Sequence, residues 1–376
     1  MEFINGILEY VLPFLAILTV LVFVHEMGHF LVARYNGVRV EIFSIGFGPE
    51  LFGRTDRSGT RWKFSLIPLG GYVKMFGDAN AASQPGGVEE MSPEERAVAF
   101  QSKRLGQRFW IVAAGPLANF LFAIVALVGL FMTVGEPFTP PVVGEVMPES
   151  AAAEAGIRPG DRVVRLDGHA IERFEDIQRL IRTRAETPVD LVIRRDGREI
   201  DLDIVPTTRE FVDNFGNTHN IGLLGITRSN VEYVQHGPTM AIWRATRETY
   251  GLSVATLDAL GQIIVGMRSA EELGGPLRIA EMSGQVAESG LVAVVWFMAV
   301  LSINLGLINL FPIPMLDGGH LLFYAFEALR GRPLGERAQE FGFRLGIALV
   351  FSLMLFVTFN DLVHLEVFEF FKRLIT

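Results

Sequence analysis

Four long apolar stretches limit what this sequence can fold into. Two of them, residues 109–134 and 289–316, contain no charged side chain. The hydrocarbon core of a bilayer is about 30 Å thick, which takes about 20 apolar residues in a helix, and only helices or closed barrels satisfy their backbone groups there. We therefore expect a polytopic α-helical membrane protein. Its four transmembrane helices are predicted at about residues 7–33, 109–134, 289–316 and 343–365.

The composition supports a membrane protein that also carries a sizeable soluble part. Half of the 376 residues are hydrophobic, and 30 residues are Phe. Cysteine is absent, which excludes disulfides and thiolate metal ligands. The net charge of −9 gives no support to nucleic-acid binding, and no nucleic-acid partner is expected. The N-terminal residues MEFING hold neither Lys nor Arg, which favours a retained first span over a signal peptide.

Basic residues beside the spans predict the orientation of the protein. None precedes the first span, whereas Arg34 and Arg39 follow it and Lys103, Arg104 and Arg108 lead into the second. Because cytoplasmic loops carry the excess of Lys and Arg, the connection between these spans is expected in the cytoplasm. The segment between the second and third spans, and both termini, are then extracytoplasmic.

Residues 40–78, between the first two spans, predict a β-hairpin. Strand-like runs flank a turn at residues 56–59. Their content of large apolar side chains is high for a solvated loop, which favours a hairpin that dips toward the membrane and lines a cavity. A hairpin that lies on the protein surface is the alternative.

The segment between the second and third spans contains a compact domain. Residues 142–207 combine strand signals, a two-residue turn at Asp196-Gly197 and one amphipathic helical pattern, which indicates an inserted α+β domain. Residues 150–168 resemble the corresponding part of a bacterial PDZ domain. Such domains bind a peptide or a free C-terminus by edge addition; the alternative is a steric module that binds nothing.

The first span carries three ionisable side chains near its end, His25, Glu26 and His29. On a helix, His25 and His29 lie one above the other on a single face, with Glu26 next to the first. This spacing lets two imidazoles hold one zinc ion while a carboxylate takes a proton from the attacking water. Because ionisable groups inside a bilayer are costly and usually functional, a chance match is disfavoured.

The third span ends in NLGLINLFPIPMLDGGH, residues 304–320. Pro312 and Pro314 interrupt the helix there, which frees backbone groups at membrane depth, a pattern typical of sites. Asp317 is the only acid in this stretch, and a carboxylate with two histidines makes three ligands and leaves one position of a tetrahedral zinc. His320 is the other candidate for the third ligand.

The spans and the inserted domain set the remaining boundaries. Residues 1–141 and 289–376 form the two parts of a membrane core, and residues 208–288 form an extracytoplasmic linker. Within the linker, residues 238–267 are expected to form an amphipathic helix on the membrane surface. If this helix crossed the bilayer, Asp317 would emerge on the side opposite the histidines.

Three motifs together resemble the site-2 protease family, in particular the bacterial regulator-of-sigma-E protease type. They are HEMGH at 25–29, GPLAN at 115–119 and NLFPIPMLDGG at 309–319, with a PDZ-like insert between the second and third spans. The resemblance implies intramembrane zinc proteolysis with one Zn²⁺ per protein molecule. The family motif places the third ligand at Asp317 rather than His320. The implied ligands are thus His25, His29 and Asp317, and Glu26 is the implied catalytic acid/base.

The resemblance also implies a substrate-binding surface. The hairpin at residues 40–74 would clasp the substrate, and Asn309 would contact it or stabilise the transition state. The substrate-binding residues implied in this way are Asn309, Pro312, Phe64, Leu66, Gly70 and Gly71.

The implied setting is a bacterial inner membrane, with the PDZ-like domain in the periplasm. The lipid bilayer and single-span membrane proteins, such as a pre-trimmed anti-sigma factor or signal-peptide remnants, are the implied partners. One departure is visible, because only about 30 residues lie between Pro206 and His236, too few for the second PDZ domain of some members.

Two other classes of function remain as alternatives. A metal-ion transporter would also place His and Asp at the midplane, but it would be expected to show internal repeats and more spans. A catalytically inactive membrane scaffold could use the PDZ-like domain, yet it would not need Glu26 and Asp317 together with both histidines. Zinc content of the purified protein and ion flux in proteoliposomes distinguish these classes.

Overall fold

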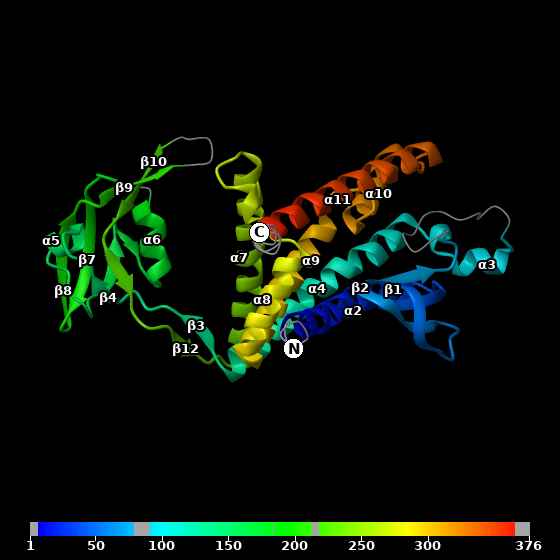
Figure 1. Cartoon of the computed structure of the whole chain (residues 1–376), viewed down its shortest axis with the longest axis horizontal. Helices are drawn as coiled ribbons and strands as arrows, with labels where there is room; N and C mark the ends of the chain where they lie inside the picture. The colour runs from blue at the N-terminus through cyan, green and yellow to red at the C-terminus, as the bar shows by residue number, and fades with distance from the viewer. Residues whose placement is uncertain (1–6, 79–90, 183, 213–217, 365–376) are drawn as a thin grey trace, which may run out of the picture. The chain divides into compact units, whose positions relative to one another are not determined.

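The computed structural model describes residues 7–78, 91–182, 184–212 and 218–364 (Figure 1). The protein forms two compact units. The helical unit comprises Met1–Gly129, Ile242–Leu257 and Glu271–Thr376, and the inserted unit comprises Leu130–Ala241 and Asp258–Ala270. The predicted end of the fourth span at residue 365 and the predicted positions of both termini lie outside the described residues.

Four helices within the described ranges are long and apolar enough to cross a membrane. They are α2 (Leu12–Tyr35, preceded by the π-helical turn η1, Ile7–Val11), α4 (Leu105–Thr133), α9 (Leu291–Leu310) and α11 (Glu336–His364). The third ends before residue 316, because Phe311 is extended (φ −62°, ψ 141°) as the residue before a proline usually is. The backbone turns there and begins a new helix, α10 (Asp317–Arg330).

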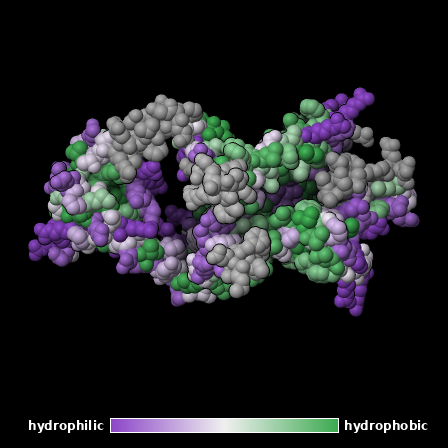
Figure 2. All heavy atoms as spheres, in the orientation of Figure 1, coloured by the Kyte–Doolittle hydropathy of each residue, from purple (hydrophilic) through white to green (hydrophobic). Residues whose placement is uncertain are grey.

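Apolar side chains on these helices point outward as well as inward. One face of α4 buries Ile111, Ala123 and Leu127 completely. The other face exposes large side chains at Trp110, Leu117, Leu121 and Val125. Figure 2 shows hydrophobic residues gathered over the helices of this unit. Helices that are apolar on both faces suit a lipid environment.

The predicted hairpin is present, but its strands are long and bent. β1 (Val40–Thr55) and β2 (Arg61–Met75) pair antiparallel around a turn. Gly46 and Gly48 have φ of +89° and +84°, which lets β1 turn on itself. Four segments therefore lie side by side, in the order 52–55, 61–64, 42–45 and 71–75. The last of them forms an edge of this sheet.

The sheet is attached to α2 by an aromatic cluster. The rings of Phe43 and Trp62 are stacked with centroids 4.5 Å apart, and Phe30 on α2 meets both rings edge-on at 5.7 and 5.0 Å. Phe43 is fully buried, whereas Leu51 and Phe52 in the second half of β1 are exposed. The base of the hairpin thus belongs to the core of the helical unit. Insertion of its outer half into a membrane stays a prediction.

Shorter helices complete the helical unit. α3 (Pro93–Val98) and the 3-10 turn η3 (Phe100–Ser102) precede α4, and the turn η4 (Ala270–Glu272) precedes α8 (Pro276–Glu288). The carboxylate of Asp361 on α11 accepts hydrogen bonds from the backbone N–H groups of Gly275, Leu277 and Arg278. These groups have no intrahelical partner at a helix start, so the one acid in the otherwise apolar stretch of α11 serves as the cap of α8.

The helix predicted on the membrane surface makes one hydrogen bond to α9. α7 (Pro238–Ile264) donates from Thr256 Oγ1 to Asn304 Oδ1 of α9 at 3.1 Å. Asn304 lies about 20 Å along α9 from its start, at about 1.5 Å per residue. The position of α7 on the membrane surface stays a prediction.

The inserted unit is an α+β module. Its central sheet has the order β6-β5-β7-β8, with further antiparallel pairs β4-β11, β9-β10 and β3-β12. The elements are β3 (Glu136–Phe138), β4 (Val143–Val146), α5 (Ala151–Glu154), β5 (Arg162–Leu166), β6 (His169–Ala170), α6 (Phe174–Arg182), β7 (Val189–Arg195), β8 (Arg198–Ile204), β9 (Thr207–Val212), β10 (Thr218–Leu223), β11 (Ile226–Arg228) and β12 (Glu232–Val234). Asp196 and Gly197, both with positive φ, form the predicted turn between β7 and β8.

The core of this module uses residues beyond the predicted boundary at 207. Ile177 and Ile181 of α6 pack with Leu191 and Ile193 of β7 in one buried cluster. Leu224 joins the same cluster, and β11 pairs with β4. Tertiary pairing with an early strand thus brings residues up to 228 into the fold, which local patterns could not show.

Candidate metal centre

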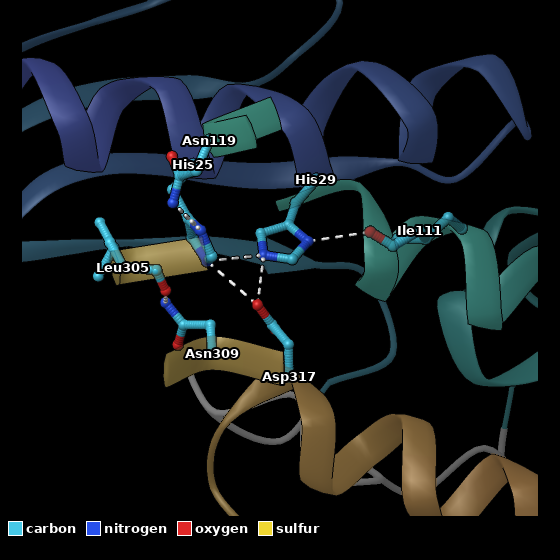
Figure 3. A network of polar contacts seen from close by, with 7 residues as sticks. All are labelled: His25, His29, Ile111, Asn119, Leu305, Asn309 and Asp317. Carbon is cyan, nitrogen blue, oxygen red and sulfur yellow. Dashed lines mark hydrogen bonds and ion pairs between the residues drawn. The ribbon is translucent and has the colours of Figure 1, made fainter. Parts of the chain in front are cut away.

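Three candidate ligands predicted from the sequence meet at one point of the helical unit. His25 and His29 project from α2, and Asp317 is the first residue of α10. Asp317 Oδ2 lies 3.1 Å from His25 Nε2 and 3.4 Å from His29 Nε2. The two Nε2 atoms are 3.2 Å apart, and all three side chains point toward one another in Figure 3.

The donor set fits a zinc ion. The potential ligand atoms of the three residues all lie within 4.8 Å of one another. Asp317 Oδ2 is buried and makes no well-directed hydrogen bond to any described residue. Two imidazole nitrogens and one carboxylate oxygen, with space for a fourth ligand, are the set that hydrolytic zinc sites use.

The turn before α10 places Asp317 beside the histidines. Met315 has a φ of +96°, which a side-chain-bearing residue rarely adopts. The following glycines allow a close approach: a Cβ at Gly318 would collide with the carbonyl of Leu310, and one at Gly319 with that of Ile313. The strained turn therefore returns the backbone tightly onto the end of α9.

The second wall of the centre comes from α4. Ile111 O lies 2.9 Å from His29 Nδ1, and Asn119 Nδ2 lies 3.1 Å from His25 Nδ1 (Figure 3). Gly115 lies between these two contacts, and a Cβ there would collide with both imidazole rings. The absence of a side chain at Gly115 thus lets α4 approach the histidines.

The candidate ligands border a cavity of about 290 Å³. Glu26 lines it beside His25, and both are about nine-tenths buried. The edge segment 71–75 of the sheet forms another wall through Gly71, Tyr72, Val73 and Met75. A Cβ at Gly71 would meet Glu26 Cγ at 3.2 Å, so the edge strand lies close against α2.

The implied substrate-binding residues are only partly brought to this cavity. Gly71 and Asn309 line it, and Asn309 Nδ2 donates to Leu305 O at 3.0 Å. The described residues that line the cavity do not include Phe64, Leu66, Gly70 or Pro312. The ring of Phe64 stacks on that of Phe52 with centroids 4.7 Å apart, and Leu66 is 56% exposed. Gly70 (φ +142°) lies against the ring of Phe47. The roles of all six residues stay predictions.

The rival ligand His320 also lines the cavity, but it is not part of the cluster of three donors that the described residues form. Its ring packs edge-on against Phe343, with centroids 5.4 Å apart. The geometry therefore favours Asp317.

Several residues at the centre were missed by the sequence prediction. Met315, Phe47 and Tyr72 line the cavity, and Gly115 and Asn119 contact the histidines. A signal existed for Asn119, since it is the only amide in the apolar run 109–134. Gly115 also lies in the GPLAN motif and Met315 in NLFPIPMLDGG, but no local pattern shows the contacts of these residues, because the contacts join segments far apart in the sequence.

Comparisons with known proteins found a family model, curated relatives and solved structures that are similar to this chain. The model of peptidase family M50 matches residues 13–353. A protein of Agrobacterium fabrum named "Putative zinc metalloprotease" is 49% identical over 359 residues, which covers 94% of this chain and 95% of that protein. Metalloprotease MmpA of Caulobacter vibrioides is 37% identical and covers 99% of this chain and 100% of that protein. Among solved structures, the PDZ domain of the SdrC-like protein from Listeria monocytogenes matches with 21% identity and a TM-score of 0.19, covering 24% of this chain and 88% of that one. The chain belongs to peptidase family M50, the site-2 protease family of zinc metalloproteases.

Proposed function

We propose that this protein is an intramembrane zinc endopeptidase that cleaves the transmembrane segments of single-span membrane proteins. The observation that carries the proposal is the convergence of His25, His29 and Asp317 on one point, with Glu26 lining the same cavity. Because α2 is one of the helices long and apolar enough to cross a membrane, this chemistry would take place at membrane depth.

His25, His29 and Asp317 would hold one zinc ion per protein molecule and leave one position free. A zinc ion held there would supply Lewis acidity. It would polarise the scissile carbonyl and lower the pKa of a water molecule to about 7. Glu26 accepts the proton of the attacking water and returns it to the leaving amine. Its burial beside the cavity keeps bulk water away from this proton transfer.

The sheet edge at residues 71–75 would present the substrate. A helical carbonyl is hydrogen-bonded to the amide four residues on, so the substrate must unwind before cleavage. Adding the unwound segment as a strand along this edge would keep its backbone groups paired in a water-poor setting. Asn309, on the wall formed by α9, would contact the segment from the other side.

The basic residues beside the spans support a proposed orientation of the protein in the membrane. We place the protein in a bacterial inner membrane with the connection between α2 and α4 in the cytoplasm. The PDZ-like module would then face the periplasm, where it binds a peptide end or excludes substrates with bulky outer domains. A pre-trimmed anti-sigma factor and signal-peptide remnants are the proposed kinds of substrate.

Glu26→Gln tests the proposal directly. We expect the variant to bind one zinc per protein molecule but to lose cleavage of a single-span reporter in detergent. Glu288→Gln is the matched control, because Glu288 is exposed at the end of α8. Undiminished cleavage by Glu26→Gln, or a wild-type protein that binds no zinc, would refute the proposal. Ion flux into proteoliposomes that survives in Glu26→Gln would favour a transporter instead.

A further inference from the structure

The two histidines of the metal centre are held by different kinds of partner. His29 Nδ1 faces the backbone carbonyl of Ile111 at 2.9 Å. A carbonyl can only accept, so Nδ1 of His29 must carry the proton. Its Nε2 then presents a lone pair toward His25 and Asp317, as a metal ligand requires.

His25 faces an amide, which can donate or accept. Asn119 Nδ2 lies 3.1 Å from His25 Nδ1, and Asn119 is completely buried. The two ends of an amide have nearly the same shape, so hydrogen-bond chemistry decides which end faces the imidazole.

An amide nitrogen facing His25 is incompatible with metal binding. In that orientation Nδ1 accepts the hydrogen bond, and Nε2 carries the proton toward His29 and Asp317. A protonated Nε2 has no lone pair for a metal. The same orientation leaves Asn119 Oδ1 buried without a hydrogen-bond partner among the described residues, which is costly.

The reversed amide leaves the lone pair of His25 Nε2 available for a metal and gives Asn119 Oδ1 a donor. His25 Nδ1–H then donates to Asn119 Oδ1, and the lone pair of Nε2 faces the other two ligands. Metal-binding histidines commonly donate their second nitrogen to an oxygen acceptor, which sets the tautomer and the ring orientation.

Two further features lie next to Asn119. Ser302 Oγ of α9 donates to the backbone carbonyl of Asn119 at 2.9 Å. Gly115 lies one turn before Asn119 on α4, and its lack of a side chain allows the approach to both imidazoles. The GPLAN motif at 115–119 thus has a physical role. Its first residue, Gly115, leaves room for the imidazole rings, and its last residue, Asn119, makes a polar contact with His25.

We propose that Asn119 is a positioning residue of the metal centre, whose amide oxygen accepts a hydrogen bond from His25 Nδ1–H and holds His25 in the metal-binding tautomer. The inference rests on the proposed zinc site. It assigns to Asn119 no contact with the substrate.

Substitutions that separate acceptor from donor test this role. Asn119→Asp keeps an oxygen acceptor of the same shape and removes the donor, whereas Asn119→Leu removes both. Ser302→Ala is the matched control, because it loses a buried hydrogen bond to the same segment but leaves the contact with His25 in place. The readouts are the zinc affinity of the metal-free protein, by competition with a chromophoric chelator, and the visible absorption spectrum with Co²⁺.

We expect Asn119→Leu to weaken zinc binding by about ten- to hundredfold and to alter the Co²⁺ spectrum. Asn119→Asp and Ser302→Ala should bind zinc like the wild type. Wild-type affinity in a folded Asn119→Leu, or a loss in Asn119→Asp as large as in Asn119→Leu, would overturn the role of Asn119. If Asn119→Leu does not fold, Asn119→Asp alone decides, because an essential donor predicts its failure. A wild-type protein that binds no zinc would instead refute the proposed function.

Discussion

Replacing Gly115 by Ala should damage the metal centre although no ligand residue is changed. An ideal Cβ at this position lies 2.9 Å from His25 Cε1 and even closer to His29 Nε2. Carbon atoms in contact are normally about 3.5–4.0 Å apart, so the rings or α4 must move by about 1 Å. A misplacement of about 1 Å in an active site can cost about a hundredfold in rate. We expect cleavage by Gly115→Ala to fall by about that factor, together with zinc affinity.

The matched control is Gly129→Ala on the same helix, where a Cβ meets nothing within 4 Å. Both changes gain the small helix preference of Ala over Gly, about 0.5–1 kcal/mol. Only Gly115→Ala also suffers from overpacking, so its free energy of unfolding should be about 1–3 kcal/mol below that of the control. Zinc titration, reporter cleavage and thermal unfolding of the two variants in one detergent provide the comparison. Equal zinc affinity and activity in both would refute the close approach of α4 to the histidines.

Two further predictions concern positions outside the centre. Asp361→Ala leaves the first N–H groups of α8 without their acceptor, so it should lower the free energy of unfolding by about 1–3 kcal/mol. The zinc affinity should not change. An unchanged midpoint of thermal unfolding would contradict the capping role of Asp361. In the inserted unit, burial raises the pKa of Asp161, but hydrogen bonds from the Arg195 guanidinium and the Arg158 backbone N–H outweigh it and hold the pKa below its ordinary value. Because the folded pKa is the lower one, this stabilisation is present above about pH 4 and is lost as the pH falls through the lowered pKa. Hydrogen-exchange protection factors of described residues in the range 142–228 of the full-length protein, which correct for the intrinsic pH dependence of exchange, should therefore fall on acidification in the wild type and fall less in Asp161→Asn. Equal pH dependence of the protection factors would contradict this role of Asp161.

Much of the architecture could be predicted from local patterns. The apolar runs predicted four helices, and the structure has four among its described residues that are long enough to cross a membrane. The turn at Asp196-Gly197 was recognisable because its backbone conformation suits those residues. His25 and His29 could be placed on one face from their spacing alone, because the period of a helix is constant.

The sheet and the contact of α7 with α9 could not be predicted in the same way. The bends that divide β1 and β2 into four neighbouring segments depend on pairing between distant residues. The contact of Thr256 with Asn304 likewise joins two helices about fifty residues apart in the sequence, so no local pattern shows it. In both cases the contact joins residues that a local stretch of sequence does not contain together.

The metal centre shows most clearly which features follow from local sequence and which depend on tertiary packing. By itself the sequence determined the types of the donor groups, the facing pair of histidines and the breaks at Pro312 and Pro314, because these follow from side-chain chemistry and helix period. Only the tertiary structure decided which segment forms the opposite wall. Gly115 and Asn119 reach the imidazoles from α4 because α2 and α4 pack at close distance, and that distance depends on the whole helical unit rather than on either sequence motif.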